Sequence, residues 1–145
     1  MPRNIDTVIL IIITIFVSNY QGFMYKNELP KNCPPSDVEQ QELSLYRLMT
    51  PNDLIESFKN HVELYEDNHL YKTECKAYAV SFFDNIDMVK KLLGKENNEG
   101  KVIAKVNIKK EHGVLSKKPS KTGHFSLWLF NNFNASDVTF ELIKV

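Results

Sequence analysis

The sequence predicts an α+β fold: a small, mixed or mostly antiparallel sheet with two or three helices on one side, preceded by a short N-terminal hydrophobic segment. Three observations predict it. Residues 101–109 alternate apolar and polar side chains with the period of a half-buried strand. Two earlier segments carry capping residues ahead of apolar stripes at helical spacing. Three strand-like runs then close the chain, an order that favours antiparallel pairing.

The composition is that of one neutral globular domain. The chain has 145 residues, of which 43% are hydrophobic and 25% are charged, so wholesale disorder is not expected. Eighteen basic residues balance eighteen acidic residues. Because a neutral domain has no net field that attracts a phosphate backbone, we expect no nucleic acid partner.

Residues 1–23 form a hydrophobic segment centred on the run from Val8 to Val17 (VILIIITIFV). As a helix this run covers about 15 Å, roughly half of a bilayer core, a length that suits a signal peptide. Three interpretations stay open: a signal peptide or membrane anchor, a buried strand, or a gene start that belongs at Met24. We expect an exported or membrane-anchored protein that contacts membrane only through this run. If translation starts at Met24, we expect a cytoplasmic protein.

The rest of the chain divides into a linker and a domain. Residues 24–35 contain three prolines and predict an extended linker. Residues 36–145 carry all the capping and periodicity signals and predict a single α+β domain. Ser36 and Glu39 have the spacing of a capping box, which predicts a helix from Asp37 toward Leu43, and residues 45–49 predict a strand.

The middle of the domain predicts two helices around a strand. Thr50 as N-cap and Pro51 at the first helical position predict a helix that buries Leu54, Phe58 and Val62. Residues 76–83 are apolar on both faces, which predicts a central strand. The second helix is predicted to start at an Asp84 cap, to end at Gly94 and to bury four apolar side chains: Ile86, Val89, Leu92 and Leu93.

The C-terminal part predicts three strands. In residues 101–109 one face holds the four apolar side chains Val102, Ala104, Val106 and Ile108, and this face is predicted to be buried. Residues 111–113 predict a turn and residues 116–123 a polar loop. Residues 124–130 and 138–145 predict the two last strands.

The two cysteines, Cys33 and Cys75, have no partner at zinc-ligand spacing, so no metal site is expected. In an oxidising compartment we expect a disulfide between them. In the cytosol we expect two reduced thiols.

The sequence contains few motifs that are typical of catalytic, metal or cofactor sites. The four histidines lack a metal-binding spacing, Ser81 lacks the frame of a nucleophile elbow, and no glycine-rich cofactor motif is present, so no cofactor is expected. Asn134 and Ser136 match the acceptor motif for N-glycosylation, which matters only in a eukaryotic secretory route.

Arg47, Ser81 and Glu141 lie on the predicted first, central and last strands. Their order resembles the Arg–Ser–Glu arrangement of ADP-ribosyltransferase-like folds, and the resemblance implies that Arg47 and Ser81 hold NAD while Glu141 orients its ribose. The sequence departs from that pattern because Ser81 stands alone and Thr139 replaces a second acid. We expect that the three side chains do not converge and that Arg47 forms a salt bridge near the sheet edge.

Two hypotheses of function follow. The first is a small, non-enzymatic accessory or binding domain, exported or anchored by residues 1–23, which engages a protein partner. The alternative is an NAD-consuming transferase that uses Arg47, Ser81 and Glu141.

Overall fold

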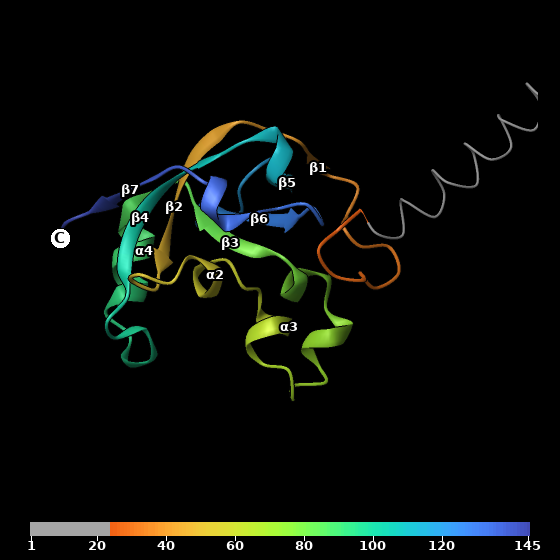
Figure 1. Cartoon of the computed structure of the whole chain (residues 1–145), viewed down its shortest axis with the longest axis horizontal. Helices are drawn as coiled ribbons and strands as arrows, with labels where there is room; N and C mark the ends of the chain where they lie inside the picture. The colour runs from red at the N-terminus through yellow and green to blue at the C-terminus, as the bar shows by residue number, and fades with distance from the viewer. Residues whose placement is uncertain (1–23) are drawn as a thin grey trace, which may run out of the picture.

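The computed structural model describes residues 24–145, which form one antiparallel sheet with helices packed on it (Figure 1). The predicted hydrophobic segment, residues 1–23, lies outside the described residues. The sheet has seven strands in the order β1-β5-β6-β3-β2-β4-β7. The strands are β1 (Val38–Glu39), β2 (Leu43–Met49), β3 (Val80–Phe83), β4 (Val102–Ile108), β5 (Gly113–Ser116), β6 (His124–Leu129) and β7 (Phe140–Ile143).

Three α-helices accompany the sheet: α2 (Leu54–Ser57), α3 (His61–Leu64) and α4 (Ile86–Leu93). Five 3₁₀ turns complete the elements: η1 (Tyr71–Thr73), η2 (Cys75–Tyr78), η3 (Glu96–Asn98), η4 (Lys110–His112) and η5 (Ala135–Asp137). The α+β class is therefore confirmed. The sheet is larger than predicted, and every strand pair in the described part of the chain is antiparallel.

The main core lies on one face of the sheet. Ala104, Val106 and Ile108 of β4 are buried there, and Val102 packs against the same cluster, as the alternation in β4 predicts. Phe58, which follows α2, closes this face and meets the Phe133 ring edge-on with centroids 5.5 Å apart. The apolar face of β4 thus contributes to the hydrophobic stabilisation of the domain.

Helices cover both faces of the sheet, which corrects the prediction that they share one side. Ile103 of β4 points away from the main core and is only 1% exposed. The helix α4 contacts β2, β3 and β4 and buries Val89 completely. We infer that α4 packs on the Ile103 face, while α2 packs on the opposite face. Two-sided burial explains why Ile103 interrupts the alternation of β4.

The helices begin later than their sequence signals predict. Asn52 adopts a left-handed φ of 60°, so residues 50–53 form a turn and Asp53 becomes the N-cap of α2. A second cap at Asn60 then starts α3, so the predicted long helix is divided in two. Asn85, rather than Asp84, caps α4, whereas Gly94 ends it as predicted.

Three further predictions need correction. The predicted helix from Asp37 is absent because Val38, its one apolar residue before Leu43, pairs with β5 instead. Residues 76–79 belong to η2 and the turn after it, so β3 is shorter than predicted, although it is central. The strand β5 replaces part of the predicted turn and loop. A Cβ at Gly113 would lie 2.1 Å from the Trp128 carbonyl oxygen, so β5 can approach β6 only through glycine.

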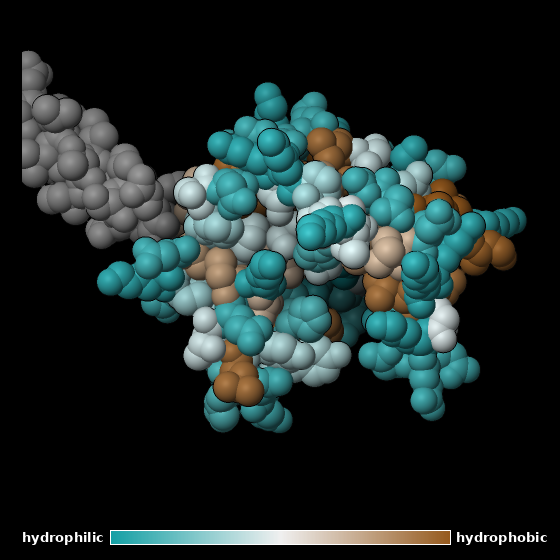
Figure 2. All heavy atoms as spheres, turned by 180° about the vertical axis from the view of Figure 1, so that it is seen from behind, coloured by the Kyte–Doolittle hydropathy of each residue, from teal (hydrophilic) through white to brown (hydrophobic). Residues whose placement is uncertain are grey.

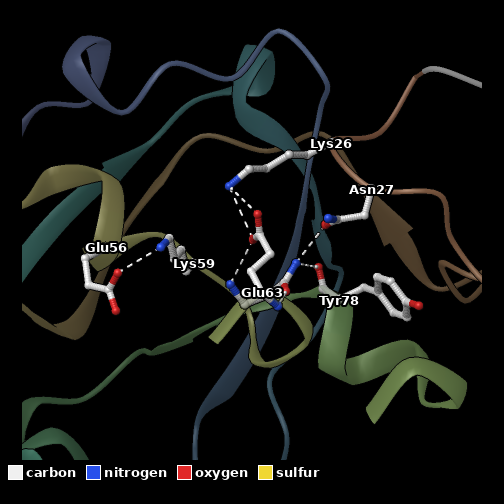
Figure 3. Close-up of polar contacts among 7 residues, drawn as sticks. Lys26, Asn27, Glu56, Lys59, Glu63 and Tyr78 are labelled. Atoms are coloured by element: carbon white, nitrogen blue, oxygen red, sulfur yellow. Dashed lines mark hydrogen bonds and ion pairs between the residues drawn. The ribbon is translucent and has the colours of Figure 1, made fainter. Parts of the chain in front are cut away.

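Residues 24–35, predicted as a linker, are attached to the domain at several points. Tyr25 forms a β-bridge with Phe130, and a disulfide joins Cys33 to Cys75 of η2. Lys26 forms an ion pair with Glu63 at 3.1 Å, as Figure 3 shows. No helix among the described residues is long and apolar enough to cross a membrane.

The buried His112 has an unusual environment. It is 5% exposed, and its Nδ1 accepts a hydrogen bond of 3.0 Å from the Lys109 backbone N–H. Its Nε2 has no hydrogen-bond partner within residues 24–145, and the ring meets Phe133 edge-on. Desolvation lowers the pKa of His112 below its ordinary value.

We therefore expect the domain to lose stability as the pH falls below about 6.5, the ordinary histidine pKa. Because the pKa of His112 is lower in the folded chain, the unfolded chain binds more protons in this pH range. The stability that the neutral His112 contributes is therefore complete above about pH 6.5 and is lost as the pH falls through the folded-state pKa. His124, whose pKa desolvation also lowers, adds to the effect. Urea unfolding between pH 7.5 and 5 measures it. His112→Gln should flatten the profile, and His69→Gln, at an exposed position, should not.

Candidate functional site

A pocket opens where β2 separates from β3. These strands pair only at Tyr46 and Phe83, whereas β2 pairs with β4 along its whole length. From this pair toward Leu48 of β2 and Val80 of β3 the two strands are unpaired, and a cavity of about 280 Å³ lies there. Its lining comes from four parts of the chain: Arg47 and Leu48; Lys59, Asn60, His61, Leu64 and Tyr65; Ala79, Val80, Ser81 and Phe83; Leu92, Lys95, Asn97, Asn98 and Lys101.

Arg47 bridges the gap between the strands. Its Nη1 donates to the Ser81 carbonyl oxygen at 2.6 Å, so the side chain replaces a missing strand-to-strand hydrogen bond. Its Nε and Nη2 donate to the Ser57 carbonyl oxygen at 3.0 and 2.7 Å. The guanidinium also lies 5.5 Å from the centre of the Phe82 ring. Three of about five N–H groups are therefore engaged, and all their acceptors are neutral.

The charge of Arg47 has no carboxylate counterpart within residues 24–145. The residue keeps some exposed surface in the pocket, although burial of the guanidinium lowers the pKa of Arg47 to about 10. At neutral pH the group is thus a partly desolvated cation. A cation of this kind favours an anion beside it, because partial burial weakens the screening of their attraction.

The remaining lining strengthens this positive field. Besides Arg47 it includes the basic side chains of Lys59, Lys95 and Lys101, and none of the lining residues is acidic. Lys59 is paired with Glu56 at 3.0 Å (Figure 3). Lys95 and Lys101 belong to no ion pair in the part of the chain that the structure describes.

One wall of the pocket is held by α3. The Asn60 side chain caps this helix by accepting from the Glu63 N–H at 2.9 Å, and Glu63 accepts from the Asn60 N–H in return. The Asn60 amide also donates to Asn27 and to the Tyr78 carbonyl oxygen, as Figure 3 shows. These bonds fix Asn60, which is only 4% exposed, and with it the start of α3 at the pocket.

The opposite wall is the connection between α4 and β4. It begins at the C-cap Gly94 and turns through η3, where the Asn98 amide donates to the Leu92 carbonyl oxygen at 2.9 Å. Lys95 and Lys101 stand at the two ends of this connection and both line the cavity. Figure 2 shows a hollow with largely hydrophilic walls between the two lower lobes of the molecule.

Aromatic rings lie at the mouth of the pocket on the α3 side. The His61 and Tyr65 rings stack with centroids 5.9 Å apart, and Tyr71 lies 5.4 Å from His61 and 5.7 Å from Tyr65. Tyr65 is 50% exposed, so much of its ring is free of protein contacts. We call His61, Tyr65 and Tyr71 the aromatic cluster.

The structure brings together two of the three predicted site residues. Arg47 and Ser81 line the same pocket. Glu141 does not line it. It is exposed on the edge strand β7, paired in register with Lys105, whereas Arg47 is in register with Ala104, so Glu141 projects from the other face of the sheet. The expected salt bridge of Arg47 near the sheet edge is wrong, because β2 is an interior strand and the acceptors are carbonyl groups.

Sequence reasoning missed the lysines and the aromatic cluster. Lys95 and Lys101 flank a segment that is predicted as an ordinary solvated loop, and nothing in their spacing indicates that they line the same pocket as Arg47. The described residues contain no group of three or more histidine, cysteine or acidic side chains that could hold a metal ion.

Comparisons with family models, curated proteins and solved structures found no match to the chain.

Proposed function

We propose that this protein is a small, non-catalytic binding domain that holds an anionic ligand in the pocket between β2 and β3. The single observation that carries the proposal is Arg47, a partly desolvated cation that lines the pocket and has no carboxylate partner among the described residues. A phosphate or carboxylate group of a ligand would supply the missing negative charge.

The charge of the pocket supports this proposal on energetic grounds. At about 4 Å, two opposite unit charges near a protein surface attract by about 4 kcal/mol before the cost of desolvation. Lys95 and Lys101 add two cations with no internal partner in residues 24–145, and no lining carboxylate competes with a bound anion. An anion in the pocket would therefore meet several unpaired donors at once.

The size of the pocket limits the ligand. Its volume of about 280 Å³ lies at the lower end of the range of ligand pockets. A small molecule with one phosphate or carboxylate group fits that range better than a dinucleotide does. The transferase alternative, with NAD bound by Arg47 and Ser81, keeps the support that these two residues share the pocket. It lacks Glu141, which projects from the other face of the sheet.

Export or membrane anchoring remains part of the proposal. The run from Val8 to Val17 supports it, because this is the most apolar segment of the chain. The disulfide between Cys33 and Cys75 supports it further, since disulfides persist mainly in oxidising compartments.

Calorimetric titration of the full chain with inorganic phosphate and pyrophosphate tests the anion site. We expect the double variant Lys95→Gln/Lys101→Gln to bind at least about tenfold more weakly, because it loses two charge-assisted contacts. The matched control, Lys117→Gln/Lys118→Gln, removes the same charge from an exposed loop outside the pocket and should bind like the unmodified protein.

Two outcomes would contradict the proposal. Equal weakening in both double variants would mean that the anion responds to overall charge rather than to the pocket. Hydrolysis of NAD that disappears in Glu141→Gln would support the transferase instead.

A further inference from the structure

We propose that the ligand of this pocket is a nucleoside monophosphate, with its phosphate at Arg47 and its base on the aromatic cluster. The inference rests on the proposed function, because it identifies the ligand class of the same pocket. It is carried by the position of Tyr65, which lines the basic pocket and also a second, shallower hollow formed by residues 64–70. A ligand that extends out of the pocket past Tyr65 therefore enters this hollow.

The exposed ring of Tyr65 suits a planar partner. The aromatic cluster holds Tyr65 in place through His61 and Tyr71, while half of its surface remains exposed. The centroids of His61 and Tyr65 are too close for a base to insert between them, at 5.9 Å, so a ligand ring would stack on an outer face. Stacking of this kind contributes roughly 10- to 100-fold in affinity per base.

The charges of the two hollows differ, and the difference orients the ligand. The inner pocket is lined by cations and by no carboxylate. The outer hollow is lined by Glu66 and Asp67 and contains no lysine or arginine among its lining residues. Carboxylates there would repel a second phosphate, but they can accept hydrogen bonds from ribose hydroxyls or from the amino group of a base. A single phosphate inside and a hydroxylated, ring-bearing portion outside match this pattern.

The volume of the site agrees with a mononucleotide. The inner pocket, at about 280 Å³, accommodates a phosphate and part of a sugar, and the base extends over Tyr65 toward the outer hollow. A simple phenyl phosphate would reach Tyr65 but would leave Glu66 and Asp67 without hydrogen-bond donors. A sugar phosphate would meet the carboxylates but would leave the Tyr65 ring without a stacking partner.

Titration of the full chain with five ligands tests the inference: inorganic phosphate, ribose 5-phosphate, phenyl phosphate, adenosine and adenosine monophosphate. We expect the nucleotide to bind at least about tenfold more tightly than ribose 5-phosphate. Tyr65→Leu, which keeps an apolar side chain but removes the ring, should abolish this difference and weaken nucleotide binding by a clearly larger factor than phosphate binding. Tyr25→Leu, the same substitution outside both hollows, should leave the difference intact.

The outcomes separate the two proposals. If the nucleotide binds no better than ribose 5-phosphate, or phenyl phosphate binds best, the ligand class is wrong while the anion site stands. If phosphate affinity falls in Tyr65→Leu by the same factor as nucleotide affinity, the ring acts on the pocket as a whole and the stacking role is wrong. If adenosine binds as tightly as its phosphate, or no phosphate-bearing ligand binds, both proposals are wrong.

Discussion

Val106→Asp is expected to leave the domain unfolded at room temperature. Val106 is 1% exposed and belongs to the main core on the face of β4 that Phe58 and its neighbours cover. An aspartate there would have to bury an unpaired charge or stay protonated. We expect a loss on the order of 4 kcal/mol or more, which is comparable with the whole stability of a small domain. Circular dichroism and urea unfolding measure it.

Asn107→Asp is the matched control, because it introduces the same residue at the next position of the same strand. Asn107 is exposed, and its Nδ2 donates to the Thr139 hydroxyl at 2.9 Å. Losing this exposed hydrogen bond should cost about 1 kcal/mol or less. If both variants lost stability equally, the assignment of one buried and one exposed face to β4 would be wrong.

Replacing both cysteines, Cys33→Ser/Cys75→Ser, is expected to lower the free energy of unfolding by about 4 kcal/mol. The disulfide spans 42 residues, so its removal frees a long loop in the unfolded chain. It also ties residues 24–35 to η2, next to the point where the Trp128 Nε1 donates to the Cys75 carbonyl oxygen at 3.1 Å. Urea unfolding under non-reducing conditions measures the loss.

The reducing agent provides the control for this prediction. Reduction should destabilise the unmodified protein by a similar amount and should not affect the double variant. Peptide mapping of protein from its own compartment, without reduction, should recover the Cys33–Cys75 peptide pair. Two freely alkylated thiols and an unchanged unfolding curve would contradict both the bridge and the argument for export.

The sequence predicts the strands of this domain better than its helices, for a physical reason. The alternation of β4 reflects burial on one face, and burial decides whether a strand is stable. Capping signals are local, and tertiary contacts override them. Thr50 and Pro51 suit a helix start, but the left-handed Asn52 makes the chain turn first. Ser36 and Glu39 suit a capping box, but the edge of β5 provides Val38 with a pairing partner.

The site is predictable only in part, because it depends on a separation of strands that no local pattern records. Arg47 and Ser81 lie on adjacent strands, and both line the pocket. Glu141 lies on the face of the sheet opposite to Arg47. Its register partner is Lys105, whereas Arg47 is in register with the adjacent residue Ala104, and adjacent residues of a strand point to opposite faces. Lys95 and Lys101 become part of the site only because the fold brings the α4–β4 connection to the same pocket as β2 and β3.

The binding of an anion at Arg47 can be tested directly through the Nε–H group of this side chain. The chain has two arginines, Arg3 and Arg47, so a proton–nitrogen NMR spectrum of arginine Nε–H groups should contain two side-chain signals. In the structure the Arg47 Nε–H donates to the Ser57 carbonyl oxygen, which should protect it from exchange with water and make it a sharp reporter. Titration with phosphate should shift the Arg47 signal to saturation while the Arg3 signal stays in place. An Arg47 signal that does not move, or two signals that drift together without saturating, would contradict the account.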